Sequence, residues 1–399
     1  MTSTFPFTSD PVVIVSAVRT PMGGFQGALS PLAAPELGSI AVSSAVQLAH
    51  IAPADVDEIF MGNVLSAGIG QNPARQAALK GGMPESLPAT TVSKVCGSGM
   101  KAVMLAHDGL IAGSNRIVLA GGMESMTNAP YLSLRTRNGA RLGHTELKDH
   151  MFLDGLEDAY TGRLMGTFAE DSAAEYGFGR QEQDVYARQS LERALAAQES
   201  GAFSREIVGI AQGEGRAAVR LDRDEQPPKA DPEKIAKLKP AFRNDGTVTA
   251  ANASSISDGA AALVLMRESE ARDRGLSPVA RILAHAGHAR APARYTSAPV
   301  GAIERLLARL GWKAGDVDLW EINEAFAVVA LIAIRDLGLD RDRVNVHGGA
   351  CALGHPIGAS GARILVTLLH ALKTHGLRKG IASLCIGGGE ATALAVELY

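Results

Sequence analysis

An internal duplication limits the folds open to this chain more than any other feature of its sequence. Stretches recur in the same order in two parts of the chain: residues 55–63 (DVDEIFMGN) with 316–323 (DVDLWEIN), 98–103 (SGMKAV) with 360–365 (SGARIL), and the glycine-terminated β patterns at 117–122 and 383–388. The first two stretches start 43 positions apart in one copy and 44 in the other. This agreement predicts two homologous halves that fold alike.

Each copy alternates short β-branched runs with helical patterns, which is typical of an α/β sheet covered by helices. In the first copy we expect strands at residues 11–16, 57–61 and 90–93. We expect one amphipathic helix at residues 34–50. The run at 260–266 reads as a strand that rejoins the first copy's sheet, and the second copy begins near Pro278. We therefore predict a first half made of residues 1–125 and 257–277, and a second half of residues 278–399.

The stretch between the copies, residues 126–256, is richer in charged and turn residues and has one clear helical pattern at 180–199. We expect it to be a loop domain inserted into the first half.

The composition is that of a globular enzyme with a large core, since 46% of residues are hydrophobic and 20% are charged. A net charge of -3 gives no reason to expect a nucleic-acid or membrane partner. Three cysteines suit a reducing compartment. The first seven residues lack the features of a targeting signal, and no apolar run reaches the roughly 18 residues of a membrane span. We expect a cytoplasmic protein.

Two cysteines and one histidine lie in glycine-rich settings, the surroundings that a thiol meeting a bulky substrate requires. They are Cys96 in VCGSGMK, His355 in GGACALGHPIG and Cys385 in LCIGGG. Cys96 falls where a strand turns into a helix beginning near Gly97, and a helix N-terminus favours a thiolate over a thiol. Two thiols and one imidazole can perform covalent acyl chemistry without a cofactor.

Simpler interpretations apply to the same motifs taken one at a time. Cys351 reads as a packed core thiol, and Cys385 on its own reads as a buried strand thiol. The glycines of residues 97–99 (GSG) suggest a dinucleotide loop, but the third spaced glycine is absent, so a nicotinamide-dependent oxidoreductase is a weak alternative. No Cys-x-x-Cys or His-x-x-x-His spacing predicts a metal site.

The combination of motifs closely resembles the thiolases, the enzymes that make or break 3-ketoacyl-CoA. It consists of residues 96–99 (CGSG), 323–327 (NEAFA), 354–361 (GHPIGASG) and 385–389 (CIGGG), in this order. The resemblance covers nearly the whole chain, including residues 16–21 (SAVRTP), 70–76 (GQNPARQ), 121–126 (GGMESM) and 246–250 (GTVTA). It implies the thiolase fold, in which two similar α/β halves stack as αβαβα layers with an inserted loop domain.

The resemblance also implies a role for each matching residue. Cys96 would take the acyl group from an acyl-CoA, His355 would accept the proton of Cys96, and Cys385 would act as acid and base in the second step. One oxyanion site would consist of His355 and a water held by Asn323. Another would consist of the backbone N–H groups of Cys96 and Gly387. No metal and no cofactor would be needed, because CoA and acyl-CoA are substrates.

The insert would handle CoA. Residues 216–243 hold eight Lys and Arg against five Asp and Glu, which suits the phosphates of CoA or, equally, a solvated surface. By resemblance Ser254 would contact the pantetheine arm with Ala250 nearby, and Phe242 and Phe326 would line its tunnel unless they are only core residues.

Two positions depart from the short-chain pattern and bear on acyl-chain preference. Leu164 stands where such enzymes commonly have a histidine, and Tyr295 where methionine is frequent. The favoured activity is that of an acetyl-CoA C-acetyltransferase in a homotetramer. A 3-ketoacyl-CoA thiolase of broader range is the alternative within the family, and an inactive CoA-binding assembly protein is a remote one.

Overall fold

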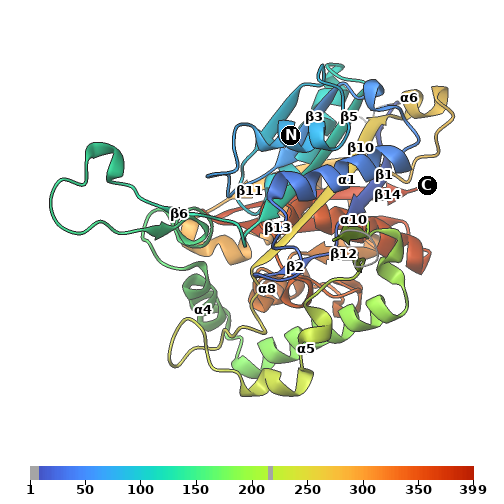
Figure 1. Ribbon diagram of the computed structural model, residues 1–399. Helices are drawn as coiled ribbons and strands as arrows, with labels where there is room; N and C mark the ends of the chain where they lie inside the picture. Colours follow the sequence, from blue (N-terminus) through green and yellow to red (C-terminus); the bar gives the residue numbers. More distant parts are fainter. Residues whose placement is uncertain (1–8, 214–218) are drawn as a thin grey trace.

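The computed structural model describes residues 9–213 and 219–399, and its centre is a mixed sheet of ten strands with helices on both faces (Figure 1). Residues 1–7 and Arg216, which entered the predictions above, lie outside the described residues. The first half contains β1 (Val12–Arg19), β2 (Gly23–Gly24), α1 (Ala34–Leu48), β3 (Glu58–Gly62), α2 (Pro73–Lys80), β4 (Ala89–Val92), α3 (Ser98–Ala112), β5 (Ile117–Ser125), β10 (Ser257–Arg267) and α6 (Glu268–Asp273). The second half contains β11 (Ala280–Ala289), α7 (Ala298–Leu310), β12 (Leu319–Ile322), α8 (Ala327–Leu337), α9 (Ala350–Leu353), α10 (Ser360–His375), β13 (Lys379–Ile386) and β14 (Glu390–Leu398).

The strand order displays the duplication. The path is β4-β3-β5-β10-β1 in the first half and continues as β11-β14-β13-β12 in the second, so the order of one half mirrors that of the other. Corresponding pairs run in the same sense: β1–β10 and β11–β14 are antiparallel, and β3–β5 and β12–β13 are parallel. Both first strands carry a bulge at the same place, at Val15 and at Leu283. In the second half, the counterpart of β4 is reduced to one bridge between Trp320 and Val344.

Each half of the continuous sheet forms one β layer, so helices and strands alternate in five layers, αβαβα. Helices α1 and α2 cover the outer face of the first half, α3 and α10 pack together between the halves, and α7 and α8 cover the outer face of the second (Figure 1). Both faces of β1 are therefore buried: Val12 and Ile14 point into the central core, and Val13 and Val15 into the core under α1. A strand covered on both sides reads as a continuous apolar run rather than an alternating one.

The halves meet edge to edge at a short contact. Strand β1 pairs with β11 over two residue pairs only, Val13 with Arg281 and Ile14 with Ala280. Most of the contact between the halves is therefore made by α3 and α10 in the central layer.

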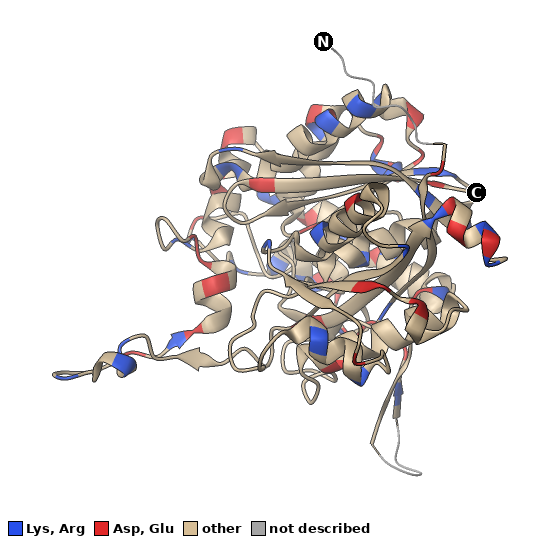
Figure 2. Cartoon of the chain, turned by 90° about the horizontal axis from the view of Figure 1, so that it is seen from above, with Lys and Arg blue, Asp and Glu red and all other residues tan. Residues whose placement is uncertain are grey.

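The insert consists of β6 (Tyr131–Leu132), β7 (Lys148–Asp149), α4 (Met165–Tyr176), α5 (Arg180–Glu199), β8 (Ile210–Gln212) and β9 (Val219–Leu221). Helix α5 has the predicted bounds, whereas α4 was not foreseen. The β6–β7 and β8–β9 segments project from the body (Figure 2). Strand β10 then rejoins the first half between β1 and β5, as residues 260–266 predicted. The exact domain boundaries remain predictions.

Over the described residues, no helix is both long and apolar enough to cross a membrane.

Candidate active site

Cys96 lies in a tight turn between β4 and α3. Val95, immediately before it, has φ of 45°, a left-handed conformation that a β-branched residue rarely adopts. The hydroxyl of Ser98 braces the turn, since it donates to the Val95 carbonyl at 2.6 Å and accepts from the Lys94 N–H at 2.8 Å. A Cβ on Gly97 would lie 2.3 Å from the Ile386 side chain, so the glycine lets the turn after β13 approach. The strained turn therefore presents the thiol to that approaching segment.

The second glycine-rich motif meets Cys96 at this turn. The backbone N–H groups of Gly387 and of Cys96 itself lie close enough to the Cys96 sulfur to lower the pKa of the thiol. Cys385, two residues before Gly387, is 1% exposed and close enough to Cys96 for the two thiols to interact electrostatically. Tyr295 is buried too, and its phenol group lies close enough to both thiols to interact with them electrostatically. Two N–H donors thus converge where an acyl group on Cys96 would place its oxygen.

His355 lies in the loop before α10, which touches the turn of Cys96. Ile357 packs in the same small cluster as Cys96. A Cβ on Gly99, at the start of α3, would stand 3.0 Å from the carbonyl oxygen of Gly358. The His355 loop therefore lies directly beside the nucleophile.

Hydrogen bonds define the tautomer of His355. Its Nδ1 is 2.5 Å from the Ser360 hydroxyl, which donates its own proton to the Pro356 carbonyl at 2.9 Å. Ser360 must then accept from Nδ1–H, so Nε2 carries the free lone pair of the neutral ring. This is the nitrogen that could take a proton from a thiol.

Asn323 follows β12 and lies against the same imidazole. Its Nδ2 is 3.5 Å from both ring nitrogens of His355, and its Oδ1 accepts from the Arg363 guanidinium at 3.3 Å. Holding Oδ1 turns the amide N–H groups toward the histidine. The predicted pair of His355 and Asn323 is therefore adjacent in the structure.

Burial keeps the thiol and the imidazole neutral. Burial, helped by the charge of Glu124, raises the pKa of the Cys96 thiol to about 11, although the N–H groups of Gly387 and Cys96 oppose the rise. Burial and the nearby Arg363 lower the pKa of His355 to about 3. The N–H groups act in the expected direction, toward the thiolate, but burial has the larger effect on the pKa of Cys96. Desolvation penalises the charged thiolate more than the two N–H groups stabilise it.

The residues assigned to the acyl and pantetheine tunnel are partly brought together. The rings of Phe242 and Phe326 are 6.0 Å apart in an edge-to-face arrangement, and the Ser254 hydroxyl donates to the Ala325 carbonyl at 3.0 Å. Tyr295 donates from its hydroxyl to the carbonyl of Met165 at 3.0 Å.

Two assigned residues lie further out. Leu164 is the N-cap of α4, one residue before Met165, which packs against the cluster containing Cys385, Tyr295 and Phe326. Any effect of Leu164 on the site would therefore act through its neighbour Met165. Ala250 is exposed and makes no contact with this set among the described side-chain interactions.

Sequence reasoning missed several residues that support the site. Buried Glu124 accepts from the N–H groups of Val64, Leu65 and Gly358, and so ties the His355 loop to the first half. Glu324 accepts from Tyr186 and Ser190 of α5 at 2.9 and 2.7 Å, which anchors the insert. Ser360 and Arg363 orient His355 and Asn323. Glu124, Glu324, Ser360 and Arg363 all lie inside the thiolase-like motifs or next to them. The motifs could therefore have drawn attention to these residues, but the sequence does not show which groups they bind.

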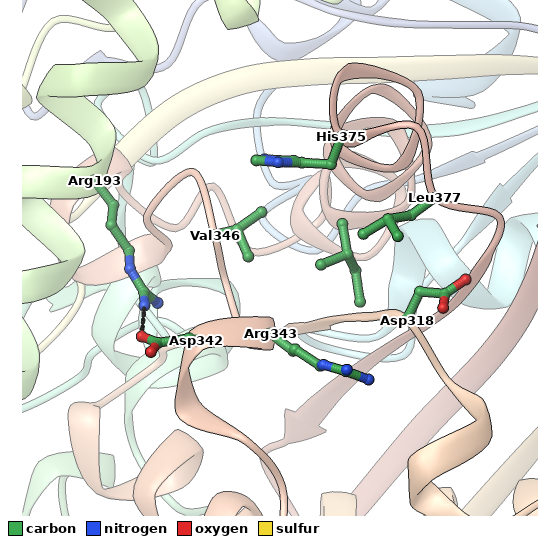
Figure 3. Close-up of a pocket in the computed structure, with 8 residues that line it drawn as sticks. Arg193, Asp318, Asp342, Arg343, Val346, His375 and Leu377 are labelled. Carbon is green, nitrogen blue, oxygen red and sulfur yellow. Dashed lines mark hydrogen bonds and ion pairs between the residues drawn. The ribbon is translucent and has the colours of Figure 1, made fainter.

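A separate cavity of about 370 Å³ lies away from this site. It is lined by Asp318, Val346, His375 and Leu377, with the Arg193–Asp342 ion pair at its side (Figure 3). None of the predicted site residues lines it.

A thiol beside an unprotonated imidazole and two converging N–H donors has the components of a cysteine-dependent acyl-transfer site. Comparison with known protein families supports this class of enzyme. The model of the thiolase N-terminal domain matches residues 12–269, and that of the thiolase C-terminal domain matches residues 276–398. The chain belongs to the thiolase family.

Several named relatives are similar over almost their whole length. Acetyl-CoA acetyltransferase 1 of Arabidopsis thaliana is 51% identical, with 97% of this chain and 94% of the relative covered. Acetyl-CoA acetyltransferase of Cupriavidus necator is 50% identical, with 97% and 99% covered. Among solved structures, the Acat5 thiolase of Ascaris suum in complex with coenzyme A is 43% identical with a TM-score of 0.93, covering 98% of this chain and 100% of that one. The thiolase fold predicted from the sequence is thereby confirmed.

Proposed function

We propose that this protein is an acetyl-CoA C-acetyltransferase that reversibly condenses two acetyl-CoA into acetoacetyl-CoA and CoA. The observation that carries the proposal is the meeting of Cys96 with the Gly387 N–H, beside a His355 ring whose free lone pair is on Nε2. The relatives named acetyl-CoA acetyltransferase support the choice of substrate.

In the first step, Nε2 of His355 takes the proton of the Cys96 thiol as the sulfur attacks the thioester carbonyl. The two N–H groups of Cys96 and Gly387 stabilise the tetrahedral oxyanion. The C–S bond to CoA breaks, Cys385 gives its proton to the departing CoA sulfur and becomes a thiolate, and S-acetyl-Cys96 remains beside the protonated His355. The neutral state of both groups suits this transfer, because no charge has to be buried before substrate arrives.

In the second step, Cys385 removes a proton from the methyl group of a second acetyl-CoA. Burial raises the pKa of the Cys385 thiol, which makes its thiolate a strong base. The enolate oxygen is stabilised by His355 and a water held by Asn323, and the enolate carbon attacks the acetyl group on Cys96. Acetoacetyl-CoA leaves, the Cys96 sulfur regains its proton from His355, and Cys385 keeps the proton it took from the methyl group. A second thiol is needed because Cys96 is acylated at that moment.

No cofactor takes part in these steps. Ser254, Phe242, Phe326 and Ala250 would contact the pantetheine arm, with Leu164 and Tyr295 bordering the acyl end. The solved Ascaris suum thiolase holds coenzyme A, which supports CoA as the ligand. Arg223 and Lys239 of the basic segment form no ion pair among the described residues, so they are available to phosphates.

The specificity is tested by kcat/KM for thiolysis of 3-ketoacyl-CoA substrates of increasing chain length. We expect a clear preference for acetoacetyl-CoA. Equal or higher rates on longer chains would replace the proposal with a thiolase of broader range, and Leu164 would be the first residue to examine.

The covalent mechanism is tested by Cys96→Ala. We expect the variant to bind CoA but to lose at least about 10⁴-fold in thiolysis, as removal of a catalytic nucleophile does. Wild-type turnover by this variant would exclude the S-acetyl intermediate. An inactive wild-type protein that still binds CoA would instead indicate an assembly role.

A homotetramer in the cytosol completes the proposal. Light scattering after size exclusion should give about four times the 41.5 kDa of one chain, and a mass of one or two chains would contradict it.

A further inference from the structure

A cluster of two imidazoles and one carboxylate lies outside the acyl-transfer site, where the two halves meet. His107 and Asp108 belong to the last turns of α3, and His285 belongs to β11. Asp108 Oδ1 is 3.2 Å from His107 Nδ1 and 2.8 Å from His285 Nε2. One donor atom from each residue fits within a span of 4.8 Å. The cluster therefore joins the first half to the second through side chains alone.

We propose that His107, Asp108 and His285 form a binding site for a Zn²⁺-class divalent ion, a structural site beyond the proposed catalytic function. Imidazole nitrogens and one carboxylate oxygen are ligands that zinc prefers, with water at the remaining position. Ligand atoms around tetrahedral zinc stand about 3.3 Å apart, because each is about 2.0–2.1 Å from the ion. The two distances to Asp108 lie close to that value.

The surroundings of the cluster suit a cation with an open coordination position. The three residues line a cavity of about 770 Å³ together with Ile111, Leu283 and Arg309, which leaves room for an ion and for water. The side chains of His107 and His285 are 16% and 14% exposed, so the imidazoles are held by packing, while Asp108 is 54% exposed and can be reached by the ion.

Positive side chains near the cluster are engaged elsewhere. Arg309 of α7 donates to the His285 carbonyl at 2.6 Å, and Arg281 of β11 pairs with Glu397 at 2.5 Å. To bind a metal, the imidazole nitrogens that now face Asp108 must lose their protons. Binding of the metal releases these protons.

The position of the site predicts what the ion does. Helix α3 starts beside Cys96, and His107 stands roughly 15 Å further along it at 1.5 Å per residue. An ion there would not touch the reacting atoms. It would instead reinforce the short β1–β11 joint by linking α3 to β11.

The test uses the full-length protein, freed of metal by a chelator and then titrated with Zn²⁺. Because Cys96 and Cys385 could bind zinc themselves, the titration is repeated with both replaced by serine. We expect one ion per chain in both forms, and a loss of more than about tenfold in affinity for His285→Gln and for Asp108→Asn, since even indirect changes around a metal alter affinity by about 10–100-fold. His144→Gln, on an exposed loop, is the matched control and should bind as wild type.

Two further readouts separate a structural ion from a catalytic one. Zinc should raise the melting temperature of wild type but not of His285→Gln, while thiolysis by His285→Gln stays within about twofold of wild type. Co²⁺ should give ligand-field bands without the strong thiolate-to-metal absorption. The proposal is overturned if zinc binds only when the two thiols are present, or if affinity is unchanged in both His285→Gln and Asp108→Asn. Asp108 is exposed, so Asp108→Asn is expected to fold even if His285→Gln does not.

Discussion

At the scale of single residues, the acyl-transfer site depends on two groups kept neutral by burial. Cys96 holds its proton and His355 lacks one, and Ser360 decides which nitrogen of the ring is free. Neutral partners avoid the cost of a buried ion pair until substrate is bound. The catalytic state is therefore prepared by desolvation and by one hydroxyl rather than by a resting thiolate.

The pH dependence of the acylation step should reflect this. The base must be unprotonated, so activity is lost as pH falls through the pKa of His355, which is about 3 rather than the usual 6.5. The Cys96 thiol, whose pKa is about 11, would ionise to the nucleophilic thiolate only at higher pH, so it adds no loss of activity in the range tested. We expect kcat/KM for acylation to be flat between about pH 5.5 and 8, where an ordinary histidine would titrate. A fall with a midpoint near 6.5 would contradict the assignment.

Replacing Ser360 by alanine removes the acceptor that holds the Nδ1 proton of His355. The ring can then adopt the other tautomer, and we expect kcat to fall by about 10- to 100-fold with little change in KM. The matched control is Ser383→Ala, since Ser383 is equally buried but its hydroxyl donates to the Thr392 carbonyl. Equal kcat losses in both variants would indicate a general packing effect and not control of the tautomer.

At the scale of elements, glycines allow backbone segments from the two halves to cross at the site. A Cβ on Gly122 of β5 would lie 2.1 Å from the Gly358 carbonyl oxygen, in the loop that carries His355. A Cβ on Gly62 would lie 2.7 Å from the same oxygen. The glycine pair that ends a β pattern in the sequence therefore marks the place where the second half approaches the first.

Gly122→Ala should push the His355 loop away from Cys96. We expect a loss of about 1–3 kcal/mol in the free energy of unfolding and a larger relative loss of kcat/KM, because backbone cannot move aside as a side chain can. Gly109→Ala is the control: Gly109 lies inside α3, its added Cβ would have no neighbour closer than 3.6 Å, and alanine there should stabilise the helix by about 0.5–1 kcal/mol. Urea unfolding and thiolysis rates measure both effects. If Gly122→Ala has the wild-type stability and the wild-type thiolysis rate, the two backbone segments have room for a Cβ and the prediction is wrong.

At the scale of the whole molecule, buried charges connect the insert to both halves. Arg19 of β1 is fully buried and pairs with Glu206 at 2.5 Å and with Asp224 at 2.6 Å, both from the insert. Glu324 of the second half binds α5 through Tyr186 and Ser190. Residues 216–243 hold eight basic and five acidic residues, but Asp224 is buried. The net positive charge that this segment exposes is therefore larger than the sequence count indicates.

Arg19→Met should destabilise the whole protein, since it leaves two buried carboxylates without a cation. Breaking a buried pair costs about 3–5 kcal/mol, which urea unfolding monitored by circular dichroism would detect. Lys80→Met is the control, because the Lys80–Glu36 pair is exposed and should contribute less than about 1 kcal/mol. Similar midpoints for the two variants would mean that the insert is held by other contacts.

The sequence by itself determined the duplication, the α/β halves, the inserted loop domain and the family, because strand and helix periodicities and the ordered glycine motifs are local patterns. It also singled out Cys96, His355, Asn323, Cys385 and Gly387, whose assigned roles stay predictions until they are measured. Only the tertiary structure decided what surrounds them: the neutral state of the thiol, the tautomer set by Ser360, and the supports Glu124 and Arg363. The cluster of Asp108 with His285 joins residues 177 positions apart. Desolvation and contacts between distant segments depend on how the chain packs in three dimensions, and no spacing along the sequence encodes them.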